Sequence, residues 1–135
     1  MASLGDLVAG VEAAGLAVEL KIAGEPAALP ASAGHAGYRI VQEALTNVLR
    51  HSTARQAQVR IEIDDCAAVI EVTDDGPKRT SAFPAGGHGV QGMQERAAAL
   101  GGSCEAGTVN GAGWRVRASI PLTGQPRMPA RGKES

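Results

Sequence analysis

Aromatic residues are scarce in this chain of 135 residues, which has one Trp, one Tyr and one Phe. A hydrophobic core must therefore be built from aliphatic side chains, within a total hydrophobic content of 44%. No charge of one sign dominates either, because 13 Lys and Arg stand against 14 Asp and Glu. That balance supplies neither the basic field of a nucleic-acid-binding domain nor an acidic tail for a cationic partner.

Long hydrophobic runs and metal-binding motifs are also missing. No apolar stretch approaches the roughly 20 residues that span a bilayer, and residues 1–10 lack the basic start and apolar core of a signal peptide. Cys66 and Cys104 lack Cys-x-x-Cys spacing, so two free structural thiols are expected rather than a zinc site. We therefore expect one cytoplasmic domain without direct membrane contact, and the length suits a single core.

Hydrophobic periodicity predicts an ordered series of strands and helices. The first expected elements are a strand over 17–22 and a helix that is capped by Ser32 and includes 38–52. A hairpin follows, with strands around 59–63 and 67–73 and its turn at Asp64-Asp65. The last elements are a helix over 90–100 that ends at Gly101-Gly102, and two strands over about 103–109 and 114–121 that flank Asn110-Gly111. In the third strand, Val69, Ile70 and Val72 are expected to be buried.

The first predicted helix has one apolar and one polar side. Its apolar face is expected to comprise Ala36, Ile40, Ala44, Leu45, Val48 and Leu49, and its opposite side Arg39, Glu43, Asn47 and Arg50.

This order of elements implies a two-layer α/β sandwich, a mixed sheet with helices on one face, rather than a doubly wound parallel fold. The domain is expected to span 1–122, followed by a polar, proline-containing and disordered tail over 123–135. Residues 76–92 are rich in glycine and have little apolar periodicity, which is typical of a functional loop, and we interpret them as a lid.

Three polar clusters carry the chemistry. Glu43, Asn47 and His51 recur every four residues, so they form one stripe along a helix. Mg²⁺ prefers oxygen ligands and suits the carboxamide of Asn47. A carboxylate one turn earlier, at Glu43, is suited to orient or deprotonate a nucleophile beside a terminal phosphate. The alternative is that these residues are ordinary solvated helix residues.

The second and third clusters follow in the chain. Asp74 ends an apolar run just before Gly76, where a carboxylate suits an adenine amino group and a glycine admits a flat ring; an ordinary Asp-Gly turn is the alternative. Gly87-x-Gly89-x-x-Gly92 matches the dinucleotide-binding pattern but follows a polar loop rather than a strand, which disfavours that fold. These glycines still suit phosphates at the start of a helix.

The order and spacing of these clusters are similar to those of a known family. Residues 38–51 closely resemble the N box of bacterial sensor histidine kinases, specifically those paired with NarL-type response regulators. Asp74-Asp75-Gly76 resembles the first glycine box and residues 87–96 resemble the second. The resemblance covers about 4–122 and implies the Bergerat ATP-binding fold shared with gyrase, Hsp90 and MutL.

The resemblance implies a role for each matching residue, with ATP and Mg²⁺ as cofactors. Asn47 would hold Mg²⁺, Glu43 would assist phosphoryl transfer, and His51 would lie near the phosphates. Asp74 would receive the adenine amino group and Gly76 would line the base pocket. The residues bordering the phosphates would be Gly87, His88, Gly89, Val90 and Gly92.

The resemblance also implies partners. Family members transfer the γ-phosphate to a histidine on a separate dimerisation domain, from which it passes to a response regulator. No His-Asp motif of that kind occurs in this sequence. We therefore expect an isolated, monomeric catalytic domain that binds ATP without autophosphorylating.

Some residues depart from the family pattern. Lys78 stands where a second glycine is usual, Gly113-Trp114 replaces Gly-Thr, and the short segment between the glycine boxes contains Pro77 and Pro84. Two alternatives stay open: an anti-sigma-type serine kinase of the same fold, and a non-catalytic interaction module whose nucleotide pocket has decayed. An ATP-driven clamp like Hsp90 is disfavoured because its further domains do not fit in this length.

Overall fold

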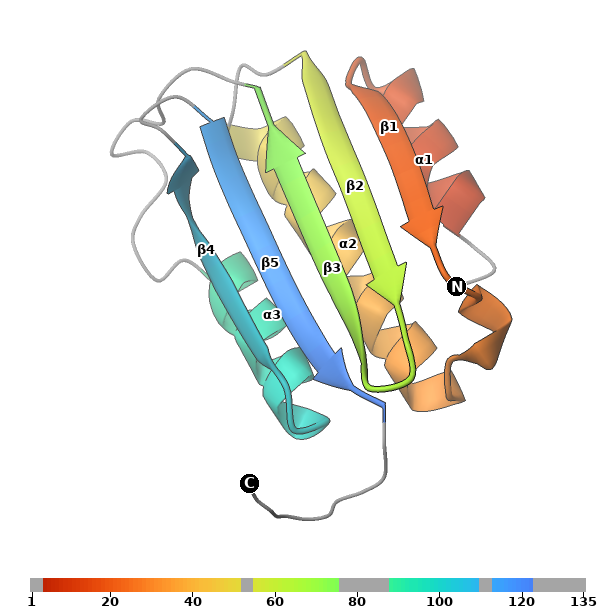
Figure 1. Ribbon diagram of the computed structural model, residues 1–135. Helices are drawn as coiled ribbons and strands as arrows, with labels where there is room; N and C mark the ends of the chain where they lie inside the picture. Colours follow the sequence, from red (N-terminus) through yellow and green to blue (C-terminus); the bar gives the residue numbers. More distant parts are fainter. Residues whose placement is uncertain (1–3, 52–54, 76–87, 110–112, 123–135) are drawn as a thin grey trace.

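The computed structural model describes residues 4–51, 55–75, 88–109 and 113–122. Within these residues, five strands form one mixed sheet and three α-helices lie on one face of it, which confirms the predicted two-layer α/β sandwich (Figure 1). The elements are α1 (Leu4–Ala13), β1 (Ala17–Ala23), a 3₁₀ turn η1 (Pro26–Ala28), α2 (Ala31–His51), β2 (Gln56–Ile63), β3 (Ala67–Asp74), α3 (His88–Ala99), β4 (Ser103–Val109) and β5 (Gly113–Pro121). The strand order is β1-β2-β3-β5-β4, with β1 and β2 parallel and the other pairs antiparallel.

The predicted hairpin between β2 and β3 is confirmed. Ile63 pairs with Ala68, and the turn is closed by the Asp64 side chain, whose Oδ1 accepts hydrogen bonds from the backbone N–H groups of Cys66 at 2.7 Å and Ala67 at 2.9 Å. These bonds lower the pKa of Asp64 below its usual value, the bond from Ala67 contributing most. An aspartate at this position therefore fixes the turn.

One face of the sheet is covered by helices and the other is open. Along β3, Ile70, Val72 and Asp74 are buried towards the helices. The alternate residues of the strand, which include Val69, are half-buried on the open face. The predicted burial of Ile70 and Val72 is confirmed, and that of Val69 is wrong. Strict alternation decides the difference, because successive side chains of a strand point to opposite faces.

The long helix α2 is buried on more than one side. It packs against β3 and β5 and also contacts both α1 and α3. Ile40 and Val41 are both fully buried, whereas Leu49, which we expected in the core, is 40% exposed. Asn47, expected on the side away from the core, is 5% exposed. A helix with neighbours on both flanks buries residues that a single apolar face does not contain.

The helix ends are set by local hydrogen bonds. The N–H of Gly34 donates to the carbonyl of Pro30 at 2.9 Å, so Pro30 occupies the cap position of α2 and Ser32 lies inside the first turn; the expectation that Ser32 caps the helix is wrong. The predicted end of α3 is confirmed. Gly101, with φ of +81°, and Gly102 donate to the carbonyls of Ala98 and Ala97 in a Schellman arrangement.

The core is aliphatic, as predicted. The largest fully buried side chains of the described residues are Leu16, Ile40, Leu45, Ile61, Ile70, Met93, Ile120, Val41, Val59, Val72 and Val116. The helix α1, which the sequence analysis did not anticipate, contributes Leu4 and Val11 to this core.

Both cysteines are free thiols, as expected. Cys104 is buried, and burial, with a smaller effect of Glu105, raises its pKa to about 11, so it is an unreactive core residue. Cys66 is exposed at the β2–β3 turn. Across the described ranges, no cluster of three or more His, Cys, Asp or Glu side chains is arranged to hold a metal ion, and no helix is long and apolar enough to span a membrane.

Candidate functional site

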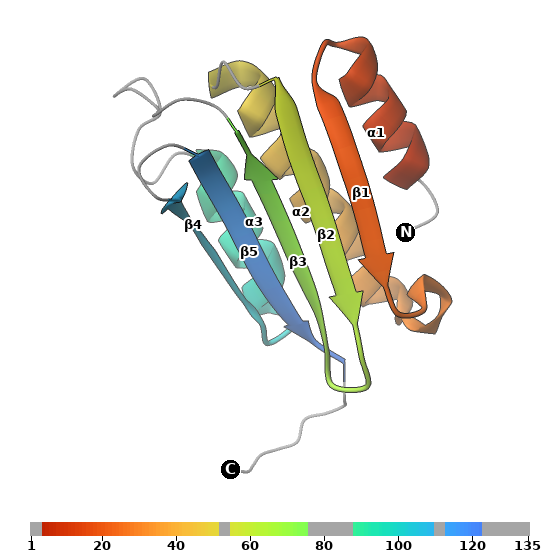
Figure 2. The same cartoon turned by 45° about the horizontal axis from the view of Figure 1, so that its top comes forward.

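The three predicted clusters converge at one end of the sandwich. At this end α2 finishes at His51, β3 finishes at Asp74, and α3 starts at His88 and runs away from it (Figures 1 and 2). The convergence follows from topology, because β2 begins shortly after α2 ends and its second residue, Ala57, pairs with Asp74. The C-terminal end of α2 and the C-terminal end of β3 therefore lie at the same end of the fold.

Asn47 is the most informative side chain at this end. It is 5% exposed, and no residue of the described ranges gives its Nδ2 a hydrogen-bond partner. Leaving a buried donor unpaired costs about 1–3 kcal/mol, which is why buried polar groups in folded proteins are nearly always paired. A carboxamide in this condition is suited to a ligand that completes its bonding.

Asp74 is the second buried polar side chain. It is 8% exposed, and strand alternation puts it on the helix-covered face, next after Val72. Asn47 and Asp74 are the only polar or charged side chains that are buried within the described part of the chain. Both lie at the same end of the layer between the sheet and the helices, α2 supplying one and β3 the other.

The other two members of the helical stripe flank Asn47. Glu43 is half-buried one turn earlier on the same face of α2, and His51 is the last residue of the helix, so its backbone lies one turn beyond Asn47. A half-buried carboxylate four residues, ~6 Å along the axis, from a buried carboxamide can serve the same ligand. The arrangement has the donor set that a hydrated divalent cation and a phosphate chain require.

The N-terminus of α3 brings backbone N–H groups to this end of the fold. The first turn contains His88, Gly89 and Val90, of which Val90 is half-buried against the core cluster. The first four N–H groups of a helix have no intrahelical partner, and the helix dipole favours an anion there. Apart from the backbone of α3 and the neighbours of Gly92 in the chain, no heavy atom of the described residues lies within 4 Å of the position that a Cβ on Gly92 would take, so these residues leave space beside it.

Several predicted residues lie outside the described ranges. Gly76 and Gly87 are among them, as are the departures Pro77, Lys78 and Pro84 and the predicted lid up to residue 87. The predicted tail over 123–135 and the turn at Asn110-Gly111 also lie outside. The roles suggested for these residues stay predictions.

Gly113 is a residue whose role the sequence analysis missed. A Cβ at Gly113 would lie 2.5 Å from the carbonyl oxygen of Asp74, far inside van der Waals contact. Glycine therefore allows β5 to pair with β3 up to its last residue, where Asp74 faces Trp114. The signal in the sequence was a glycine that opens a strand, which often marks a close backbone approach.

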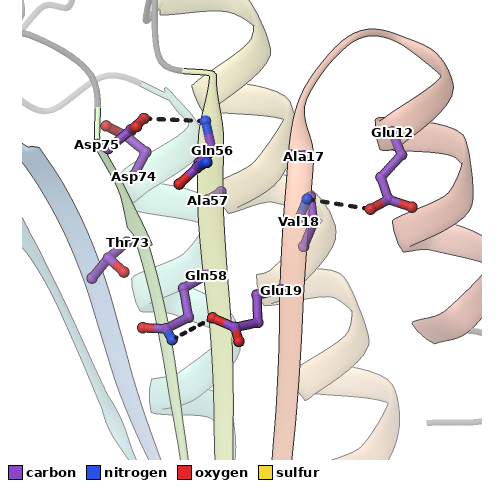
Figure 3. A pocket seen from close by; sticks show the side chains of 10 residues that line it. All are labelled: Glu12, Ala17, Val18, Glu19, Gln56, Ala57, Gln58, Thr73, Asp74 and Asp75. Atoms are coloured by element: carbon purple, nitrogen blue, oxygen red, sulfur yellow. Dashed lines mark hydrogen bonds between the residues drawn. The ribbon is translucent and has the colours of Figure 1, made fainter.

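A cavity of about 630 Å³, which shares Asp74 with the end described above, lies beside β1, β2 and β3 (Figure 3). Its lining residues are Glu12, Ala17, Val18, Glu19, Gln56, Ala57, Gln58, Thr73, Asp74 and Asp75. Three of the carboxylates that line the cavity accept hydrogen bonds within the chain. Asp75 accepts from the backbone N–H groups of Arg55 and Gln56 at 3.2 and 3.1 Å, Glu19 from the side chain of Gln58 at 3.0 Å, and Glu12 from the backbone N–H of Val18 at 3.4 Å. We therefore place the candidate site at Asn47 rather than in this groove.

Comparison with known proteins gives one family. The model of the histidine kinase-, DNA gyrase B- and HSP90-like ATPases matches residues 35–124. The sensor histidine kinase YxjM of Bacillus subtilis is 38% identical over 112 residues, which are 82% of this chain and 27% of that protein. LiaS of the same organism, also a sensor histidine kinase, is 36% identical over 86 residues, 63% of this chain and 24% of that protein.

A solved structure shares the fold. The histidine kinase AdeS of Acinetobacter baumannii superposes with a TM-score of 0.68 at 16% identity, covering 90% of this chain and 64% of that one. The present chain spans about a quarter of the length of the curated relatives that it matches.

Proposed function

This chain belongs to the family of histidine kinase-, DNA gyrase B- and HSP90-like ATPases, as the ATP-binding catalytic domain of a sensor histidine kinase, and we propose that it presents Mg²⁺-ATP for phosphoryl transfer to a histidine on a dimerisation domain outside this chain. One observation supports the proposal most strongly. Asn47 and Asp74, which the family pattern pairs with metal and adenine, are the two buried polar side chains of the described residues and lie at one end of the fold.

The residues at this end fit the groups assigned to them. Asn47 offers a carboxamide oxygen to Mg²⁺ and an unpaired Nδ2–H to a phosphate oxygen. Bound Mg²⁺ supplies charge neutralisation of the phosphates. Glu43, half-buried one turn away, orients the incoming histidine and accepts its proton. Asp74 accepts a hydrogen bond from the adenine amino group.

The remaining proposed contacts surround the base and the phosphates. Gly76 borders the base, and the residues that border the phosphates are His51, Gly87, His88, Gly89, Val90 and Gly92. Backbone N–H groups at the start of α3 hold the anionic phosphates, which the dipole of that helix favours.

The proposed partners follow from the resemblance of residues 38–51. They are a dimerisation and phosphotransfer domain of the same kinase and, downstream, a response regulator of the NarL type. The domain over 1–122 acts in the cytoplasm, binds no nucleic acid and is monomeric on its own. It does not autophosphorylate without the dimerisation domain.

Calorimetric titration with ATP, with and without Mg²⁺, tests the proposal. We expect Mg²⁺-dependent ATP binding. Asn47→Ala is expected to weaken it through loss of the metal. Asp74→Asn is expected to weaken the binding of ATP more than the binding of tripolyphosphate, which has no base. Thr46→Ala and Asp65→Asn are the matched controls, because Thr46 is a half-buried neighbour on α2 and Asp65 an exposed carboxylate at the opposite end of β3.

Two results would contradict the proposal. Binding of ATP by both site variants at the parent's affinity would show that the residues are wrongly assigned. No binding at millimolar ATP would favour an interaction module that has lost its nucleotide pocket. If Mg²⁺-ATP binds, adding a histidine-bearing dimerisation domain in trans tests phosphotransfer directly.

A further inference from the structure

We propose that Trp114 is a base-binding residue of this nucleotide site, with its indole as the wall against which the purine packs beside Asp74. The inference rests on the proposed function, since it assigns a new contact within the same site. In the family pattern Trp114 is a departure, because it stands where a threonine is usual.

The register of the sheet brings Trp114 and Asp74 together. They are directly opposite in the antiparallel pair of β3 and β5, and the Cβ atoms of such residues are roughly 4.5–5.5 Å apart. Further along β5, Val116, Ala118 and Ile120 are buried towards the helices, and alternation places Trp114 on the same face. The indole and the carboxylate therefore share one face at one end of the sheet.

The exposure of Trp114 also points to a ligand. The core of this chain is aliphatic, and Trp114 packs against that core but is only half-buried. A large aromatic side chain thus borders the end where the Nδ2 of the buried Asn47 has no hydrogen-bond partner among the described residues. The other aromatic residue of the described ranges, Tyr38, precedes Asn47 by nine positions on α2, about 13 Å along the helix.

Gly113 keeps the indole next to the carboxylate. Because it has no Cβ, β5 approaches the Asp74 carbonyl closely, and the strand pairing continues through Trp114. The two side chains then have complementary tasks. An aromatic face binds any base by stacking, whereas a carboxylate selects one that carries an amino group.

The single tryptophan makes a direct experiment possible, because all indole emission of the chain comes from Trp114. The protein is titrated with Mg²⁺-ATP and, separately, with Mg²⁺-tripolyphosphate, which has no base. Tryptophan fluorescence and the heat of binding, by calorimetry, are measured in parallel. We expect ATP to change the emission spectrum and tripolyphosphate to bind without changing it.

Variants then separate contact from architecture. Trp114→Thr is expected to bind ATP at least about tenfold more weakly, which corresponds to the loss of one stacking contact, while Trp114→Phe stays within about threefold of the parent. Neither is expected to change the affinity for tripolyphosphate. Val116→Ala is the control, because it removes buried volume from the same face of β5 two cross-strand pairs further from the site.

Three outcomes would overturn the assignment. If calorimetry shows ATP binding but the emission does not change, the assignment of Trp114 to the base is refuted and the proposed nucleotide site is not. Tighter ATP binding by Trp114→Thr would have the same consequence, because it would show that the indole obstructs the base. An absence of ATP binding in calorimetry would refute both the assignment and the proposed function.

Discussion

Gly113 and the carbonyl oxygen of Asp74 meet across β3 and β5, so closely that a Cβ on Gly113 would lie 2.5 Å from that oxygen. Any other residue at this position would push the two strands apart at the end where Asp74 and Trp114 pair. The carboxylate proposed to read the base is therefore positioned by a residue without a side chain.

Replacing Gly113 by Ala tests this relationship. We expect the Gly113→Ala domain to lose about 1–3 kcal/mol of unfolding free energy, the usual cost of a forced backbone shift, and to bind ATP about tenfold more weakly. Urea unfolding and calorimetry measure the two effects. Gly107→Ala on β4 is the control, since apart from its neighbours in the chain no heavy atom of the described ranges lies within 4 Å of its Cβ position. Equal effects at both glycines would contradict the prediction.

The sequence predicted the residue types of the site better than their burial. Asn47 was found by its spacing from Glu43 and His51, yet helical periodicity placed it opposite the core. The helix α3 packs against α2 from a position far along the chain, so α2 has more than one buried side. Local patterns contain no information on such a contact, and for the same reason Leu49 was wrongly expected to be buried.

The unpaired amide of Asn47 predicts a conflict between stability and binding. Asn47→Leu replaces a buried, unsatisfied group with an apolar one of similar size, so we expect the unfolding free energy to rise by about 1 kcal/mol and Mg²⁺-dependent ATP binding to be lost. Thr46→Val, at the half-buried adjacent position, is expected to change neither strongly. A large loss of stability in Asn47→Leu would show that the amide has a structural partner after all.

The fold was predictable where the pattern is regular and less so at α1. Its core contacts, Leu4 and Val11, have helical spacing, but Gly5 and Gly10 lower helix propensity. The signal that could have revealed the helix is its end. Gly15, with φ of +107°, donates to the carbonyl of Glu12 in the same kind of glycine cap that ends α3.

Gly92 offers a second test in which stability and binding change in opposite directions. The open space at its Cβ position means that Gly92→Ala fits the fold and should stabilise α3 by about 1 kcal/mol. If Gly92 borders the phosphates, the added methyl group weakens ATP binding. Gly10→Ala, at an exposed position of α1 with equal space, is expected to stabilise without affecting ATP; unchanged ATP affinity in both variants would remove Gly92 from the site.

The hairpin turn at Asp64 predicts a pH dependence of stability that is independent of the site. Hydrogen bonds from the backbone of Ala67 and Cys66 lower the pKa of the Asp64 carboxyl in the folded state, so the folded chain binds its proton less readily than the unfolded chain. The resulting stabilisation is complete above the unfolded pKa of about 3.9 and is lost as the pH falls through the lower folded value. We expect Asp64→Asn, which does not titrate, to lose less unfolding free energy than the parent between pH 5 and pH 3 in urea titrations. Asp65→Asn controls for the change in net charge, and parallel pH profiles for the parent and Asp64→Asn would show that the turn does not depend on this carboxylate.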